Sequence, residues 1–385
     1  MKAVVKKHLN VRLNEAHVNA PKLGVLNPGE EISISHTIKG QSIEGNNIWC
    51  VLHDKRIIWS GGLSVSVDDL PGAPQKYVLA TADDYGVYDE IDEGIEHALK
   101  NKWINSVAVL VNKDGKDNYT RLERLRNFLL NNNLTDKVHV GLHFTFASGK
   151  PLESSHKYII NRKGFFRNPF FIDESYYDQK AYLNEVKVEL TAQLDKFKNV
   201  FGKPDHFTSH FDTHTFSKKL FEQVLSSIDN TPIRNYHFIP KHKRILLDVI
   251  NTASFPSTRK LDKLLLSWPS KKISDQTIVS HYGPPGFFAI WNYARQIRKK
   301  RDKLCKHVSS FYSSNDNVVE VVYHLIKYGK LSQRKFRKIF KAQKKQYPHL
   351  NPDYFDGRVA EFHSLAAKRP WDAFDKISFL PKPNQ

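Results

Sequence analysis

From Tyr77 onward, short apolar runs alternate with segments whose apolar residues recur every three or four positions. The first pattern is that of a buried strand, and the second is that of a helix with one buried face. The expected strands are residues 77–82, 105–111, 137–146 and 317–326, and the expected helices are residues 88–101, 119–132 and 181–202. Strands that alternate with helices favour an α/β architecture with a mainly parallel sheet or barrel.

The chain before this region has a different pattern, with short alternating runs, turns and no helical period. This pattern predicts a small all-β barrel. The stretches "LNVRLNEA" (9–16) and "GVLNPGEEI" (24–32) and the strand around Trp49 stand in the order typical of bacterial SH3-like domains, which this region resembles. We expect Trp49 to lie in the core of such a domain.

With 385 residues, the chain is long enough for a large and a small domain, each with its own core. We expect the SH3-like β-barrel at residues 1–68, a linker containing Pro and Gly at residues 69–75, and a (β/α)-barrel-like domain at residues 76–385. Cys50 and Cys305 are the only cysteines. Two thiols so far apart in the sequence predict neither a disulfide framework nor a thiolate metal site.

The formal net charge is +19, and the positive charge is concentrated in residues 294–307 and 334–345. A charge of this size favours anionic partners, so the two basic runs are candidates for binding an anionic polymer. Solvated helix faces are the simpler interpretation of both runs. Nucleic acid is disfavoured as a partner, because no zinc-finger or RRM signature accompanies the basic residues.

No apolar run reaches the length that a transmembrane helix needs. The N-terminal stretch "MKAVVKKHLNVRLN" has basic residues but lacks the apolar segment of a signal peptide. We therefore expect a cytoplasmic protein without a transmembrane segment. Association with the cell wall is the alternative, because SH3-like modules of this kind often accompany cell-wall enzymes.

The first expected strand of the large domain ends in two adjacent aspartates, Asp83 and Asp84, followed closely by Gly86. In α/β proteins, ligands collect at the carboxyl ends of strands. Two neighbouring carboxylates cannot both be buried as ions without partners. A divalent cation bound to one of them removes this conflict. The competing interpretation is a plain helix cap, because aspartate is common before helices.

Further side chains that can bind metals stand at the ends of other expected strands. They are His139, His143, His210, Asp212, His214 and His324. His139 and His143 share one strand face, with Gly141 between them leaving room for another group to approach. Histidines combined with a carboxylate suit zinc or a similar first-row metal.

A second metal chemistry also fits part of this pattern. The run "HFD" (210–212) followed by His324 matches the ligand order of non-haem iron oxygenases. Those sites sit on double-stranded β-helices, however, and long helical patterns flank this region. We therefore treat this hypothesis as a minor alternative.

The ordered set of motifs resembles that of the YdjC-like carbohydrate deacetylases, the chitooligosaccharide deacetylase family. The matching stretches are "ADDYG" (82–86), "GLH" (141–143), "SGKPL" (148–152), "TSHFDTH" (208–214), the pair Glu320 and His324, and the pair Arg358 and Glu361. Each match is weak alone, but all occur in order over most of the large domain. The resemblance implies a metal-dependent hydrolase that removes N-acetyl groups from an amino-sugar oligosaccharide or glycan.

The resemblance also implies a role for each matching residue. Asp84, His143 and His214 would bind one divalent metal ion, zinc or magnesium. Asp83 would be the general base, and His324 would be the general acid. These residue types suit amide hydrolysis, because a metal polarises the carbonyl and activates a water. A carboxylate can then accept the water proton, and a histidine can protonate the departing amine near neutral pH.

The sequence departs from the family pattern after the third motif. The family usually continues D-S-H-x-H-x-H, whereas Phe216 and Lys218 stand at the later histidine positions here. Leu325 and Ile326 replace the usual proline and glycine after the last histidine. These differences bear on the sugar substrate more than on the metal. The alternative functions are a phosphoesterase on the same barrel and a non-catalytic glycan-binding protein.

Overall fold

The computed structural model describes residues 1–13, 15–54, 56–72, 76–112, 118–167, 172, 174–228, 231–234, 276–279, 293–312, 317–327, 354–374 and 377–382. The chain divides into two compact units. The first unit comprises Met1–Val78, Asp302–Val319 and Pro370–Ser378, and the second comprises Leu79–Arg301, Glu320–Arg369 and Phe379–Gln385. The expected domain boundary in the linker at residues 69–75 stays a prediction.

The first unit contains a six-stranded sheet. Its strands are β1 (Lys2–Val4), β2 (Leu9–Leu13), β3 (Lys22–Leu26), β4 (Glu31–Ile43), β5 (Asn46–Leu52) and β6 (Arg56–Trp59). They lie in the order β1-β4-β5-β6-β2-β3, and each neighbouring pair is antiparallel. Two short 3-10 helices follow, η1 (Ser60–Gly62) and η2 (Val67–Asp69). The predicted β character of this region is confirmed, and its assignment to the SH3-like domains stays a prediction.

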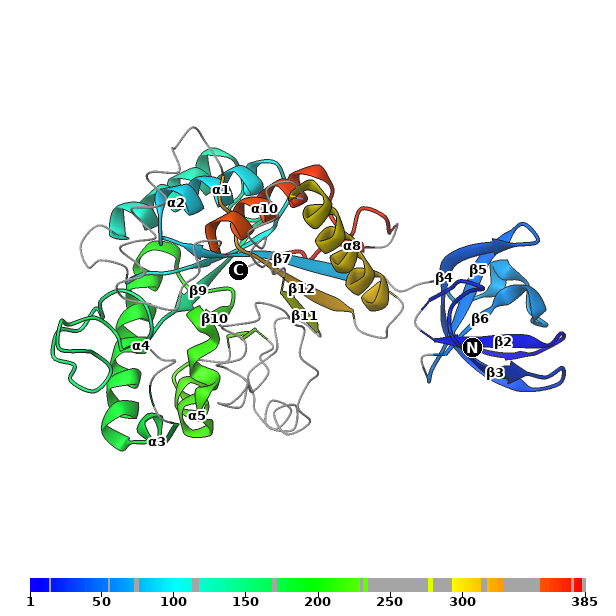
Figure 1. Ribbon diagram of the computed structural model, residues 1–385, viewed down its shortest axis with the longest axis horizontal. Coiled ribbons are helices and arrows are strands. Elements are labelled where there is room, and N and C mark those ends of the chain that lie inside the picture. Colours follow the sequence, from blue (N-terminus) through cyan, green and yellow to red (C-terminus); the bar gives the residue numbers. More distant parts are fainter. Residues whose placement is uncertain are drawn as a thin grey trace. The chain divides into compact units, whose positions relative to one another are not determined.

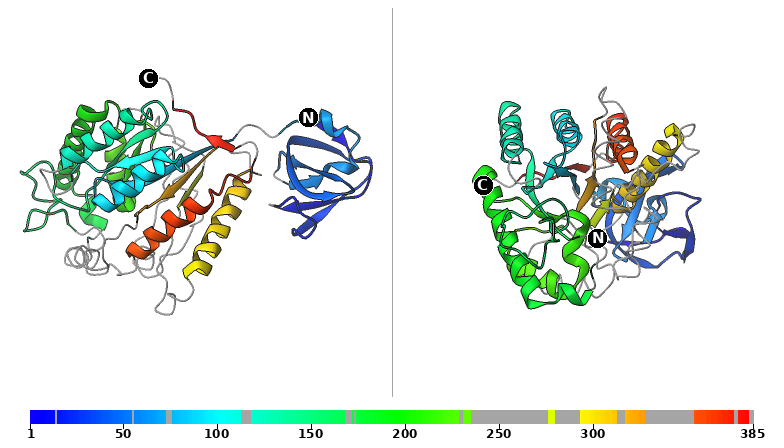
Figure 2. Two further views of the ribbon diagram at one scale, coloured as in Figure 1. Left: turned by 90° about the horizontal axis from the view of Figure 1, so that it is seen from above. Right: turned by 60° about the vertical axis from the view of Figure 1, so that its left-hand side comes forward.

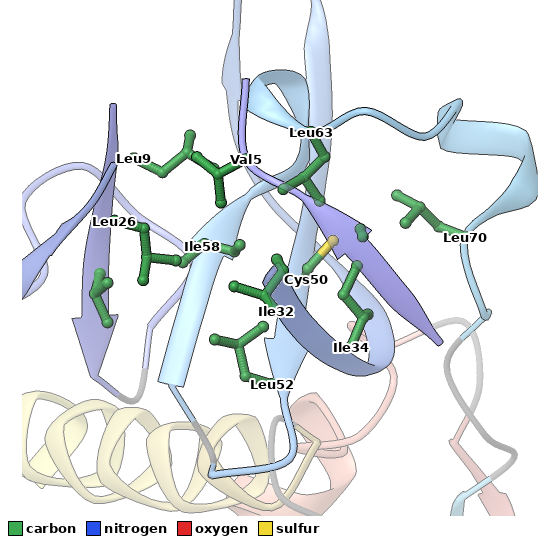
Figure 3. Close-up of a cluster of buried hydrophobic side chains, with 12 residues drawn as sticks. Val5, Leu9, Leu26, Ile32, Ile34, Cys50, Leu52, Ile58, Leu63 and Leu70 are labelled. Carbon is green, nitrogen blue, oxygen red and sulfur yellow. The ribbon is translucent and has the colours of Figure 1, made fainter. Parts of the chain in front are cut away.

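Apolar side chains of the first unit pack in two buried clusters, and Figure 3 shows one of them. The residues labelled there are Val5, Leu9, Leu26, Ile32, Ile34, Cys50, Leu52, Ile58, Leu63 and Leu70. Burial raises the pKa of the Cys50 thiol to about 12, so this thiol stays protonated and unreactive. Trp49 is only 2% exposed, and its indole N–H donates to the carbonyl of Gln41 at 2.9 Å. The prediction that Trp49 is a core residue is confirmed.

A seven-stranded sheet forms the second framework. Its strands are β7 (Lys76–Tyr85), β8 (Ser106–Val109), β9 (His139–Phe144), β10 (Phe207–Ser209), β11 (Gln276–Val279), β12 (Val318–Tyr323) and β13 (Ile377–Phe379). The order is β10-β9-β8-β7-β12-β11, with β13 paired to β7. The four strands from β7 to β10 run parallel, and the sheet is curled (Figure 1). This mixed α/β fold with a curled parallel sheet fits the predicted barrel-like domain.

Helices connect the strands of this sheet and cover it. They are α1 (Asp89–Lys100), α2 (Asn118–Asn131), α3 (Glu174–Tyr177), α4 (Lys180–Phe201), the 3-10 segment η4 (His210–Phe216), α5 (Lys218–Ser226), α8 (Tyr293–Tyr312) and α10 (Tyr354–Ala367). Figures 1 and 2 show α1, α2 and α10 along one side of the sheet. None of the described helices has the length and apolar character needed to cross a membrane.

The helices form where the sequence predicts them, and for the predicted reasons. The apolar residues of α1 that recur at helical spacing, Ile91 and Ile95 among them, are buried against the sheet side. Helix α4 is followed by Gly202, whose positive φ of 75° is a conformation that glycine adopts without strain. The basic run 294–307 lies in α8, whereas the run 334–345 lies outside the described residues. Binding of an anionic polymer by these runs stays a prediction.

The room left by Gly141 on β9 is taken by another histidine. A Cβ atom added to Gly141 would lie 2.2 Å from Nε2 of His206, which itself is fully buried. His206 precedes β10, the neighbour of β9 in the sheet. The small residue at position 141 therefore leaves room for the imidazole of His206 to pack against β9.

We expect the substitution Gly141→Ala to destabilise the fold by about 1–3 kcal/mol, because the added methyl group overlaps a buried ring that has no open space to enter. Gly24→Ala is a matched control, since a Cβ atom added at Gly24 meets no atom within 4 Å. The control should change stability by no more than about 0.5 kcal/mol. Urea unfolding followed by circular dichroism measures both. Equal stability of Gly141→Ala and the wild type would show that His206 moves aside freely.

Candidate metal site

The two adjacent aspartates stand at the carboxyl end of β7, where the strand becomes irregular. Asp84 has a left-handed backbone with a φ of 72°, and the pairing with β8 changes register at this point. Gly86 follows with a φ of 93°, and its N–H donates to Asp92 Oδ1 on α1 at 2.7 Å. Both faces of β7 are buried from Val78 onward, and Asp83 and Asp84 are buried as well, at 3% and 2% exposure.

Asp84 forms a buried group with His143 and His210 that could hold a metal ion. Asp84 Oδ1 lies 2.8 Å from His210 Nδ1 and 3.3 Å from His143 Nε2. One ligand atom from each of the three residues lies within 4.8 Å of the others. His143 is near the end of β9 and His210 directly follows β10, so the parallel strands bring all three ligands to one edge of the sheet. Two imidazoles and one carboxylate are a typical ligand set of a zinc site with an open position.

Other side chains orient two of these possible ligands. The second carboxylate oxygen of Asp84, Oδ2, lies 2.8 Å from Nη1 of Arg358 on α10. The second ring nitrogen of His143, Nδ1, lies 2.7 Å from the hydroxyl of Thr208 on β10. Asp84 and His143 thus each have one atom in the group of three, and a second atom whose contact fixes the orientation of the side chain. Contacts of this kind are usual behind metal ligands, and the donor set therefore fits a divalent cation.

The electrostatics of the group favour the protonation states that metal ligands need. Burial opposes ionisation of Asp84, but His210 and Arg358 outweigh it and hold the pKa of Asp84 well below its usual range. Burial lowers the pKa of His210, although Asp84 acts in the opposite direction. An ionised carboxylate and a neutral imidazole are the forms that bind a metal.

Asp83 is held by an arginine that the sequence analysis did not single out. Arg234 donates from Nη1 and Nη2 to the two carboxylate oxygens of Asp83, at 2.6 and 2.8 Å. The same guanidinium contacts Glu320 on β12 through Nε and Nη2, at 2.9 to 3.0 Å. Burial opposes ionisation of Asp83, but Arg234 and, to a lesser degree, His143 lower its pKa to about 2. Asp83 is therefore an ionised carboxylate beside the Asp84 group.

His214, which the resemblance assigned to the metal, has other partners in the structure. Its Nδ1 is 2.7 Å from the hydroxyl of Ser209, and its ring contacts Phe144 and Phe221 at centroid distances of 5.5 and 5.6 Å. Burial, followed by the charge of Arg234, lowers the pKa of His214 to about 3. Among the described residues, the group with Asp84 and His143 contains His210 in its place.

The turn that carries these residues has an unusual backbone. Phe211 and Asp212, inside η4, have φ values of 58° and 50°. Consecutive left-handed residues other than glycine are strained, and such strain is often found at functional sites. Asp212 is half-buried. Burial raises its pKa to about 7, with Arg234 opposing this effect and Asp83 adding to it.

His324 directly follows β12, as expected. Its backbone N–H donates to Oε2 of Glu361 on α10 at 2.7 Å, and its side chain is half-buried. A positive charge on His324 would lower the pKa of Asp83. Glu320 and Arg358, the other residues of the two late motifs, contact Arg234 and Asp84 respectively. The late motifs therefore converge on the two aspartates.

Two features of the site were missed in the sequence. The S-H-x-H-x-H part of the family pattern can be aligned from Ser209, which makes His210 the first histidine and puts Asp212 at the position of the second. The spacing alone did not favour this alignment over the one that matches D-S-H to Asp212, Thr213 and His214. Arg234 follows the short segment "TPI", which pairs with β10 through the isolated bridge between Phe207 and Ile233. A single apolar residue before an arginine is too weak a signal for a strand end.

A curled parallel sheet with a buried Asp–His–His group at its carboxyl edge defines an α/β protein with a candidate metal centre. The family model described as "YdjC-like protein" matches residues 77–346 of this chain. Because the match covers well over half of the chain, the protein belongs to the YdjC-like family.

Individual relatives agree with this assignment. A carbohydrate deacetylase of Danio rerio is 25% identical over 209 residues, which cover 51% of this chain and 64% of the relative. A carbohydrate deacetylase of Clostridium beijerinckii is 26% identical over 43% of this chain and 62% of the relative. A chitooligosaccharide deacetylase of Proteus mirabilis is 30% identical over 38% of this chain and 53% of the relative. The chain thus spans between half and two thirds of the length of these proteins.

A solved structure supports the fold. A putative cellobiose-phosphate cleavage protein from Enterococcus faecalis V583 superposes with a TM-score of 0.51 at 18% sequence identity. The superposition covers 80% of this chain and 98% of that protein. At this level of identity, the likeness concerns the fold alone.

We expect the substitution Arg234→Gln to destabilise the protein by about 3–5 kcal/mol near neutral pH, because it leaves the carboxylates of Asp83 and Glu320 buried without their cation. Arg126→Gln is the control, since Arg126 is 52% exposed and lies 3.6 Å from Glu123. The control should change stability by less than about 1 kcal/mol.

The pH dependence of this destabilisation follows from the Asp83 pKa. In the wild type, the ionised Asp83 stabilises the fold above its ordinary pKa of 3.8, and this contribution is lost as the pH falls toward about 2. Without Arg234, burial raises the pKa of Asp83. In the variant, protonation therefore removes the unpaired buried charge of Asp83 at a higher pH than in the wild type. The difference between Arg234→Gln and the wild type should therefore shrink as the pH is lowered toward about 4. Urea unfolding over this range measures it, and a constant difference would contradict the assignment.

Proposed function

We propose that this protein is a metal-dependent hydrolase that removes N-acetyl groups from an amino-sugar oligosaccharide or glycan. The observation that carries the proposal is the buried group of Asp84, His143 and His210 with the ionised Asp83 beside it. The relatives named as carbohydrate and chitooligosaccharide deacetylases support the same activity and the same class of substrate.

We assign Asp84, His143 and His210 as the ligands of one divalent ion. Zinc is favoured over magnesium, because imidazole nitrogens suit zinc and magnesium prefers oxygen ligands. When bound, such an ion supplies Lewis-acid chemistry, which polarises an amide carbonyl and makes a water molecule more acidic. Arg358 and Thr208 keep Asp84 and His143 oriented toward the ion.

Asp83 acts as the general base in this proposal. It is ionised, and an ionised carboxylate is the form that accepts a proton from water. The ion pair with Arg234 lowers the proton affinity of Asp83 and so weakens it as a base. Glu320 competes for the same guanidinium with contacts at 2.9 to 3.0 Å, which limits this weakening. Arg234 and Glu320 are therefore positioning residues that tune Asp83.

His324 acts as the general acid that protonates the departing amine. Histidine changes its charge near neutral pH, so it can donate a proton in the same pH range in which Asp83 is ionised. Glu361 accepts from the backbone N–H of His324 at 2.7 Å and thereby fixes the chain directly after β12. The base and the acid come from neighbouring strands, β7 and β12, at the edge that carries the metal group.

Release of acetate from chitooligosaccharides tests the activity directly. The purified protein should release acetate from N,N'-diacetylchitobiose or longer oligomers, lose this activity on treatment with a chelator and regain it with added zinc. An enzyme that instead releases phosphate from a sugar phosphate, and no acetate, would support the phosphoesterase alternative. Metal binding without turnover of any N-acetylated glycan would refute the proposal.

Metal content and turnover of single variants test the roles of the residues. Asp84→Asn, His143→Ala and His210→Ala should lose metal, because each removes a ligand. Asp83→Asn should keep its metal, while kcat falls by roughly two to four decades through loss of the base. His324→Ala should behave like Asp83→Asn.

His214→Ala is the informative control for the ligand set. It should keep a full metal content, because His214 contacts Ser209 and two phenylalanines and lies outside the metal group. Metal stoichiometry by atomic absorption, measured alongside turnover, distinguishes the two histidines. Loss of metal in His214→Ala with retention in His210→Ala would reverse the assignment.

A further inference from the structure

The turn that follows the two aspartates is bound to helix α1. The carbonyl of Asp84 accepts from the N–H of Val87 at 3.2 Å, and Gly86 has a φ of 93°. A bond of this kind closes a four-residue turn in which a positive φ at the third position favours glycine. Because the closing bond uses the N–H of Val87, the buried N–H of Gly86 needs another partner. It donates to Oδ1 of Asp92 on α1 at 2.7 Å.

Asp92 is itself fixed in position. It lies near the start of α1 and is fully buried, and its second carboxylate oxygen, Oδ2, contacts Nη1 of Arg121 on α2 at 2.5 Å. Burial raises the pKa of Asp92 to about 6, with the N–H of Gly86 and the charge of Arg121 opposing this effect, so the carboxylate is ionised in slightly alkaline solution. The two oxygens of Asp92 thus have different partners, and one of these partners belongs to the turn after the aspartates.

Asp84 needs this support because its own backbone is strained. Its φ of 72° is left-handed, a conformation that costs free energy in residues other than glycine and persists only where the surroundings enforce it. The same backbone directs the carboxylate of Asp84, whose oxygens lie 2.8 Å from Nδ1 of His210 and 2.8 Å from Nη1 of Arg358. A turn released from α1 would relax toward an ordinary backbone conformation, and the carboxylate of Asp84 would then lose its direction toward the histidines.

We propose that Asp92 is a positioning residue of the metal site, which holds the turn at Gly86 in the conformation that directs Asp84 to the histidines. This inference rests on the proposed function, in which Asp84 binds the metal and the neighbouring Asp83 is the base. The side-chain contacts of Asp92 are to Gly86 and Arg121, so it acts on the metal ion through the turn. Loss of a contact behind a metal ligand commonly lowers metal affinity by about 10- to 100-fold, which is readily measured.

The zinc affinity of the full-length protein tests this role, because metal binding does not depend on catalysis. It is measured by competition with a chromophoric chelator in slightly alkaline buffer, where Asp92 is ionised. Asp92→Leu removes the acceptor for the N–H of Gly86, while Arg121 keeps the exposed Asp89, at 2.8 Å, as a partner. Asp92→Asn removes the charge but keeps a side-chain oxygen that accepts from the same N–H.

Two further variants separate the turn from the packing of the helices. Arg124→Gln is the matched control, because it removes a second ion pair between α1 and α2, with Glu96 at 2.7 Å, and leaves Asp92 unchanged. The double variant Asp92→Leu/Arg121→Met takes the place of Asp92→Leu if the single variant fails to fold. It removes the ion pair as a whole and leaves no unpaired charge, a replacement that proteins often tolerate. Thermal unfolding establishes that each variant is folded before the zinc titration.

We expect Asp92→Leu, or the double variant in its place, to bind zinc about 10- to 100-fold more weakly than the wild type. Asp92→Asn should stay within about fivefold of the wild-type affinity, because the hydrogen bond to the turn is kept. Arg124→Gln should stay within about twofold. In saturating zinc, Asp92→Leu should lower kcat for acetate release more than it changes KM, because the turn also sets the place of Asp83 beside the metal.

Three results would overturn the inference. The first is a wild-type zinc affinity in Asp92→Leu. The second is an equal loss in Asp92→Asn, which would assign the effect to the charge of Asp92, and the third is an equal loss in Arg124→Gln, which would assign it to the packing of α1 on α2. If the wild type binds zinc but releases no acetate from N,N'-diacetylchitobiose, the proposed function fails, and the zinc affinities still decide whether Asp92 positions Asp84. If the wild type binds no zinc, both fail.

Discussion

Charge compensation between neighbouring carboxylates is the constraint on which this site depends. Asp83 and Asp84 are adjacent, buried and ionised, and each alone would be strongly unfavourable in the interior. Each is stabilised by its own cationic partner, Arg234 for the first and Arg358 for the second. Because the two arginines come from distant segments of the chain, the two carboxylates are stable together only when the large fold is complete.

The same contacts give the two aspartates different surroundings. Asp84 directs one oxygen to Arg358 and the other to the histidines, which leaves it oriented as a ligand. Both oxygens of Asp83 are bound by Arg234, so this carboxylate stays apart from the metal group. With the roles proposed above, removal of Arg358 would alter metal binding and removal of Arg234 would alter proton transfer.

The segment after β10 combines strain with function. Its left-handed residues, Phe211 and Asp212, separate His210 from His214, and the two histidines have different surroundings as a result. His210 meets Asp84, whereas His214 packs against aromatic rings. A regular helix over the same residues would place these two histidines, four positions apart, on the same face. The strained backbone thus brings His210, and not His214, into contact with Asp84.

The sequence by itself determined the elements and placed Asp84 and His143, two members of the candidate metal group, at strand ends. Hydrophobic periodicity located the helices and the parallel strands within a few residues, because burial of one face acts locally on the chain. The positions of Asp83, Asp84 and His143 at strand ends followed from the same pattern, since parallel strands bring their carboxyl ends together.

The tertiary structure decided what local patterns could not. It brought His210 to Asp84, through two left-handed backbone angles that no residue type at those positions requires. It also brought Arg234 to Asp83, a pairing of residues 151 positions apart in the sequence. Ion pairs of this kind depend on distances across the assembled sheet, and the spacing of residues along the chain does not contain those distances.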